Sequence, residues 1–157
     1  MSSNANATDI DARLRALRAI WAALLGSVFL YAVVGYAVSP PGLSWRALGF
    51  AGESGSVTLA LVASGLYMVG LLSAVLFPQL LLRSFLRRAE AEQNPALVQT
   101  GFILALAVCE AGALLGLVIL FLVASWNAFL LMGISAMSIA LLRPRREQLA
   151  AACYKTS

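Results

Sequence analysis

Long apolar stretches separated by short polar segments dominate the chain. They cover residues 20–38, 57–82, 102–124 and 126–142. A helix that spans a bilayer needs roughly 20 mostly apolar residues, and the first three stretches meet that need. The fourth reaches spanning length only when residues 126–128 join the apolar run that begins at Phe129. The pattern predicts an all-α integral membrane protein with four transmembrane helices.

Helix-breaking residues divide these stretches. A Pro40-Pro41 pair follows the first, and an Asn94-Pro95 pair lies between the second and the third. Before Asn94, two Arg–Glu pairs have helical spacing, so we expect the second and third helices to continue beyond the membrane as far as this pair. The predicted organisation is an N-terminal segment over 1–19, a membrane domain over 20–142 and a basic tail over 143–157.

The composition agrees with this pattern. Hydrophobic residues make up 61% of the chain and charged residues 11%, and the mean hydropathy is +0.88. A soluble domain carries about a quarter charged residues. We therefore expect a multi-pass protein of an inner or cell membrane, with the lipid bilayer as its first partner.

Basic residues predict the orientation. Ten of the eleven lie before the first stretch, between the second and third, or after the fourth. These ten are Arg13, Arg15, Arg18, Arg83, Arg87, Arg88, Arg143, Arg145, Arg146 and Lys155. Only Arg46 lies in the other loops. By the positive-inside rule, both termini and the basic tail are cytoplasmic. Anionic lipid headgroups account for the net charge of +4, and no nucleic-acid partner is expected.

The sequence lacks the residues of most enzyme sites. It has no histidine, so it has no histidine general base or histidine metal ligand. It also has no phosphate-binding loop. Its two cysteines, Cys109 and Cys153, fall in a span and in the tail and cannot pair within one chain. We predict no catalytic activity, no metal site and no cofactor.

Glu110 is the one acidic or basic residue well inside a span. A charge at that depth costs about 3 kcal/mol on insertion scales. The carboxyl group avoids much of this cost by remaining neutral. A neutral acid that ionises briefly is suited to binding or relaying protons, whereas one that stays neutral can bond another helix and support assembly. Both interpretations remain open. A proton fits this position better than sodium, because sodium needs several oxygen ligands and residues 111–113 offer no side-chain oxygen. The second span can supply oxygen ligands from Ser64 or Tyr67 only if the register between the two spans permits.

A stripe of small residues runs along the same span. At helical spacing, it consists of Ala105, Cys109, Gly112 and Gly116. Small residues allow another helix to approach closely, so this stripe predicts a helix–helix contact. Glu110 lies away from the stripe, on a bulkier face with Leu106 and Leu114.

Residues 93–123 resemble the polar loop and carboxylate helix of the rotor-ring proteolipid, subunit c, of rotary ATPases. The matching positions are Arg88, Gln93 to Pro95, Glu110, Ala111 and Gly116-Leu117-Val118. The resemblance implies that Glu110 binds the transported ion. The chain departs from that family in placing a further span after this carboxylate.

Two functions follow as hypotheses. The first is an oligomeric, proteolipid-like membrane protein that binds or relays protons through Glu110. The second is a small structural or accessory subunit of a larger membrane complex, with no transport or catalytic site of its own. In both, the protein partners are copies of this chain or other membrane subunits. A stand-alone transporter is disfavoured, because it would show more polar residues and broken helices near mid-membrane than this sequence has, where Pro78 near one end of the second span is the exception.

Overall fold

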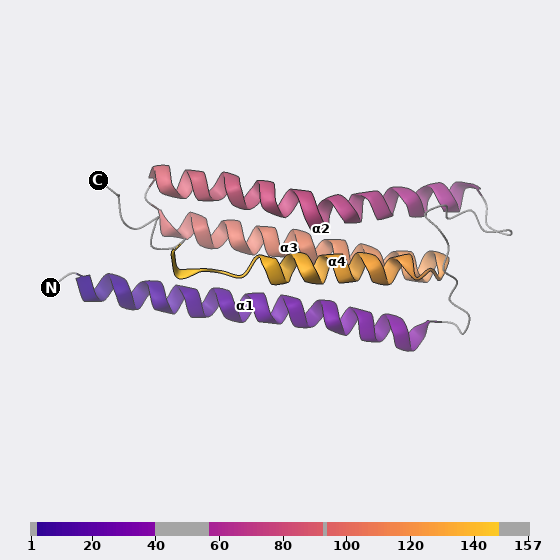
Figure 1. The fold of residues 1–157 in the computed structure, drawn as a ribbon, viewed down its shortest axis with the longest axis horizontal. Helices are drawn as coiled ribbons and strands as arrows, with labels where there is room; N and C mark the ends of the chain where they lie inside the picture. The colour runs from indigo at the N-terminus through magenta and orange to yellow at the C-terminus, as the bar shows by residue number, and fades with distance from the viewer. Residues whose placement is uncertain (1–2, 40–56, 93, 148–157) are drawn as a thin grey trace.

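The computed structural model describes residues 3–39, 57–92 and 94–147. These residues form an antiparallel bundle of α-helices (Figure 1). The helices are α1 (Ser3–Val38), α2 (Val57–Glu92), α3 (Pro95–Val123) and α4 (Asn127–Leu141). The all-helical architecture predicted from the apolar pattern is confirmed.

Helix α3 is the centre of the bundle. It contacts each of the other three helices, and α4 also packs against α1 and α2. Buried apolar side chains form three clusters along its length, around Phe102, Cys109 and Ile119. Because α3 contributes to all three clusters, its side chains meet a protein neighbour on several faces. Other positions of α3, such as Leu104, Leu114 and Val118, are exposed.

The boundary between α2 and α3 is set by local chemistry. The Asn94 side chain accepts a hydrogen bond from the Ala96 N–H at 3.0 Å, which caps the first turn of α3. Pro95 occupies the first helical position, where its missing N–H has no cost. Helix α2 continues to Glu92, so the predicted extension of both helices to the Asn94-Pro95 pair is confirmed.

In α1, no break separates the predicted N-terminal segment from the membrane helix. Helix α1 runs from Ser3 to Val38 without interruption. Leu14 and Leu17 lie in the same buried cluster as Phe102. Residues 3–19 are therefore continuous with the membrane helix, and Leu14 and Leu17 pack against the bundle.

Three helices within the described residues are long and apolar enough to cross a membrane, in α1, α2 and α3. Helix α4 is also apolar but has only 15 residues. At 1.5 Å per residue it is about 22 Å long, against about 30 Å for the hydrocarbon core. The protein is thus a membrane-embedded helical bundle whose last helix is shorter than a full span.

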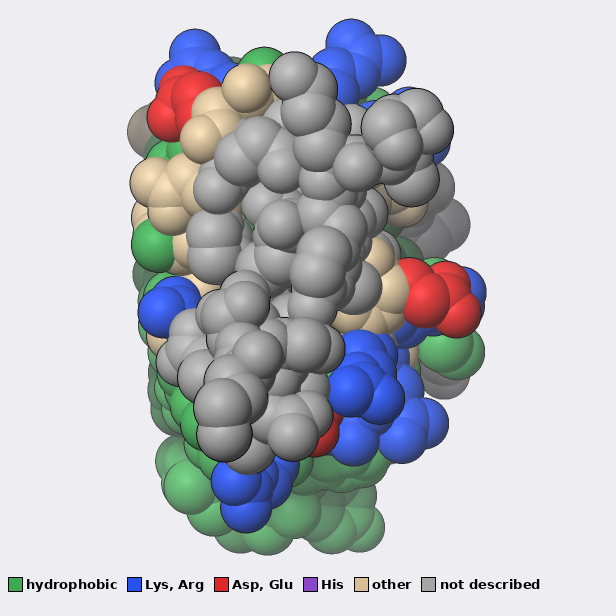
Figure 2. Space-filling view, turned by 90° about the vertical axis from the view of Figure 1, so that its left-hand side faces the viewer, with side chains coloured by type: hydrophobic (Ala, Val, Ile, Leu, Met, Phe, Trp, Pro, Cys, Tyr) green, Lys and Arg blue, Asp and Glu red, His purple; other side chains and the backbone are tan. Residues whose placement is uncertain are grey.

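Basic side chains gather at one end of this bundle. Figure 2 shows the end at which α2 finishes and α3 begins, with basic side chains around its rim. The segment after α4 returns to this end, where Arg146 forms an ion pair with Asp11 of α1 at 3.4 Å. Arg46, Cys153, Lys155 and residues 148–157 of the predicted tail lie outside the described residues.

Candidate functional site

Glu110 lies near the middle of α3 and faces α1. Two hydroxyl groups of α1 meet its carboxyl group. The Ser27 Oγ atom is 2.7 Å from Glu110 Oε1, and the Tyr31 hydroxyl oxygen is 2.9 Å from the same atom. Ser27 and Tyr31 are one helical turn apart, so both side chains leave α1 on one face. All three groups are partly buried between the two helices.

Ser27 has a second possible acceptor. Its Oγ atom is also 2.8 Å from the carbonyl oxygen of Leu24, one turn earlier in α1. A serine hydroxyl has a single proton to donate. Ser27 can therefore donate to Leu24 or to Glu110, but not to both at full strength.

The oxygen positions suit two arrangements of protons. In the neutral arrangement, Tyr31 donates to Glu110 Oε1, the protonated carboxyl donates to Ser27, and Ser27 donates to Leu24. In the ionised arrangement, Tyr31 and Ser27 both donate to the carboxylate. Release of the carboxyl proton to an acceptor outside the site, together with rotation of the Ser27 hydroxyl, converts the neutral arrangement into the ionised one. The Oε1 atom of Glu110 can thus keep both hydroxyl contacts with or without the proton.

The same distances describe direct hydrogen bonds rather than a cation cage. Oxygen pairs at 2.7 and 2.9 Å fall in the range of O–H···O bonds. The contacts of Glu110 with Ser27 and Tyr31 are therefore hydrogen bonds. Separately, the part of the chain that the structure describes contains no group of three or more acidic, cysteine or histidine residues that could hold a metal ion.

The small-residue stripe lies on other faces of α3. Ala105, Cys109, Gly112 and Gly116 are all buried. A Cβ atom on Gly112 would lie 3.0 Å from the Gly70 carbonyl oxygen of α2, and one on Gly116 would lie 3.0 Å from the Ala128 carbonyl oxygen of α4. Both distances are shorter than ordinary carbon contacts, so the two glycines allow backbones to approach. The stripe is a helix-packing surface, and Glu110 faces a different helix.

Cys109 has a specific neighbour in α2. Its Sγ atom is 3.8 Å from the carbonyl oxygen of Ala74. That carbonyl lacks its usual helical partner, because the residue four positions later is Pro78, which has no N–H. Figure 1 shows α2 bent partway along its length, as expected for an internal proline. The buried thiol thus contacts a carbonyl oxygen that the proline leaves free.

Sequence reasoning missed Ser27 and Tyr31. The two hydroxyls that it considered as further ligands, Ser64 and Tyr67, are on α2, and Tyr67 packs with Ile119 more than two turns of α3 away from Glu110. A usable signal was present. Ser27 follows the start of its apolar stretch by seven residues, and Glu110 follows the start of its own by eight. Counted from the basic end, the two groups are at matching depth.

Comparison with known protein families, with curated proteins and with solved structures finds no match for this chain. The resemblance of residues 93–123 to rotor-ring proteolipids therefore stays a prediction. The function has to be argued from the geometry around Glu110.

Proposed function

We propose that the chain is a proteolipid-like membrane protein that binds a proton at Glu110, with Ser27 and Tyr31 as its hydrogen-bonding partners. The observation that carries this proposal is the double role of Ser27, whose hydroxyl lies within hydrogen-bond distance of both Glu110 and Leu24. Proton binding needs a site that is stable in both protonation states. Rotation of one hydroxyl group provides this, so no other group has to move when the proton leaves.

The placement of the site agrees with such a role. Glu110 is on a helix that is apolar enough to cross a membrane, and an ionised group at that depth is costly without donors. Two hydroxyl donors lower this cost in the ionised state. The carboxyl group is only partly buried in the single chain, so a second copy or another membrane subunit can meet it at the seam between α1 and α3.

The proposed topology has four spans, with both termini on the cytoplasmic side of an inner or cell membrane. Two contacts support it. Arg146 and Asp11 pair at the basic end, which brings the segment after α4 beside the first part of α1. Trp21 Nε1 donates to the Ile139 carbonyl at 2.7 Å, which ties the last turn of α4 to α1. Local thinning of the bilayer accommodates the short α4.

A structural or accessory subunit is the second candidate. The observation that favours it is that the Glu110 hydrogen bonds join α1 to α3. In this case the carboxyl group stays neutral and acts only as a bond between helices.

The two candidates differ in what Glu110→Gln does. A neutral amide can replace a neutral acid in hydrogen bonding, but it cannot release a proton. In cells that carry only the variant, we expect normal insertion and assembly, with loss of the proton-coupled membrane activity that the wild type supports. Glu92→Gln makes the same chemical change at an exposed helix end and should leave that activity unchanged. Full activity with Glu110→Gln would instead establish the accessory role.

A further inference from the structure

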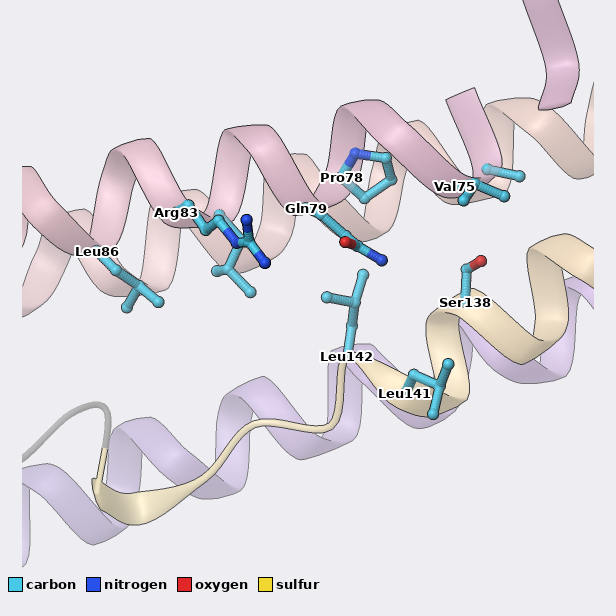
Figure 3. Close-up of a pocket in the computed structure, with 10 residues that line it drawn as sticks. Val75, Pro78, Gln79, Arg83, Leu86, Ser138, Leu141 and Leu142 are labelled. Carbon is cyan, nitrogen blue, oxygen red and sulfur yellow. The ribbon is translucent and has the colours of Figure 1, made fainter. Parts of the chain in front are cut away.

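A cavity of about 230 Å³ lies between α2 and the last turn of α4 (Figure 3), and neither Glu110 nor its two hydrogen-bond partners line it. On the α2 side, Val75, Gln79 and Arg83 line it at intervals of four residues, so they form one stripe of that helix. On the other side it is lined by Ser138, Leu141 and Leu142. The cavity is therefore a groove that runs along α2. Its walls are mostly apolar, and the guanidinium group of Arg83 lies toward the basic end of the bundle.

The groove exists because α4 stops early. Helix α4 ends at Leu141, and the chain after it turns toward α1, where Arg146 pairs with Asp11. Figure 3 shows this segment running beside α1 while the α2 side chains face the space that it leaves. A full-length span would continue alongside α2 and cover this stripe. No described segment of the chain after Leu141 covers this stripe, so lipid of the surrounding bilayer can reach it.

The chemistry along the groove changes with depth. Val75 is apolar, Gln79 offers an amide, and Arg83 offers a guanidinium group. Figure 3 shows the Arg83 side chain directed into the space between the helices. Among the described residues that line the groove, none is acidic. Arg83 thus offers a charge that suits an anion, with an apolar channel leading away from it.

We propose that this groove binds an anionic phospholipid from the leaflet at the basic end of the bundle. Arg83 binds the phosphate, because its guanidinium fork matches phosphate geometry. One acyl chain lies along the stripe toward Val75. The eight residues from Arg83 to Val75 rise about 12 Å, and one leaflet contributes about 15 Å of hydrocarbon.

Native mass spectrometry of the protein in mild detergent tests this proposal. The probes are phosphatidylglycerol and phosphatidylcholine with identical acyl chains. Both lipids carry the phosphate, but phosphatidylcholine also carries a quaternary ammonium cation that Arg83 repels, so we expect the anionic lipid to bind more tightly to the wild type. Arg83→Gln should weaken its binding by about tenfold or more, the effect of losing one charge-assisted hydrogen bond. Arg88→Gln removes the same charge from a residue that does not line the groove, and it should change binding by less than about twofold.

A second pair of variants tests the groove itself. Ser138→Phe fills the cavity without altering the charge, and it should weaken binding of both lipids. Ala140→Phe adds an aromatic ring to an exposed position of the same helix and should not. Equal affinity for the two lipids, equal effects of Arg83→Gln and Arg88→Gln, or unchanged binding in Ser138→Phe would each overturn the proposal.

Discussion

The carboxyl group of Glu110 shows how much one residue depends on its neighbours. Its position in an apolar helix could be read from the sequence, because a single acidic residue in a long apolar run is visible without a fold. Its partners could not be identified in the same way, because matching depth alone does not decide which helix faces Glu110. Whether α1 or α2 faces Glu110 depends on how the helices pack, and the helical wheel of α3 does not specify that. Ser27 and Tyr31 become partners only once α1 is placed.

At this scale we predict that Tyr31→Phe destabilises the folded protein. The variant keeps the ring and removes the hydroxyl that donates to Glu110 at 2.9 Å. The expected loss is about 0.5–1.5 kcal/mol in the free energy of unfolding, measured by denaturant titration in detergent micelles. Tyr36→Phe is the matched control, since Tyr36 is on the same helix and 71% exposed. Equal stability of the two variants would show that the Tyr31 hydrogen bond contributes nothing.

At the scale of the helices, sequence reasoning was most successful at boundaries and at small residues. Asn94 and Pro95 are a cap and a first-turn residue whose effects are local, so the start of α3 could be predicted. The stripe of small residues could be recognised by its spacing alone. The contact between Cys109 and Ala74 could not, because it depends on the register between α3 and α2 as well as on the carbonyl that Pro78 leaves free.

The packing of α3 gives a prediction for Gly112→Leu and Gly116→Leu. In both, the new side chain meets backbone oxygen atoms at 3.0 Å, and overpacking of this kind costs about 1–3 kcal/mol. We expect a smaller fraction of monodisperse protein in size-exclusion chromatography. Gly26→Leu is the control, because a Cβ atom at Gly26 meets nothing within 4 Å. Normal folding of both α3 variants would refute the close-packing role of these glycines.

For the whole molecule, the ion pair between Arg146 and Asp11 brings the segment after α4 beside the first part of α1, at the end of the bundle where basic side chains gather (Figure 2). The short α4 could be anticipated from its apolar run, whereas the groove beside it could not. The groove depends on where the chain goes after Leu141, and no periodicity encodes that path.

The corresponding prediction concerns topology. Reporter fusions at Ser3 and at Thr156 should both report the cytoplasm, and one placed near Gly55 should report the opposite side. The physical reason is the excess of arginine at one end of the bundle. A signal from opposite sides at the two termini would mean that α4 does not cross the membrane.

The most direct test of the central claim is the reaction of Glu110 with a hydrophobic carbodiimide, followed by peptide mass spectrometry. This reagent attacks protonated carboxyl groups within the membrane. A proton-binding Glu110 should be labelled in the wild type, with labelling that decreases as the pH rises and the proton is lost. Glu110→Gln should show no label at this position. Absence of labelling at Glu110 in the folded protein, or labelling that does not change with pH, would contradict proton exchange at this site.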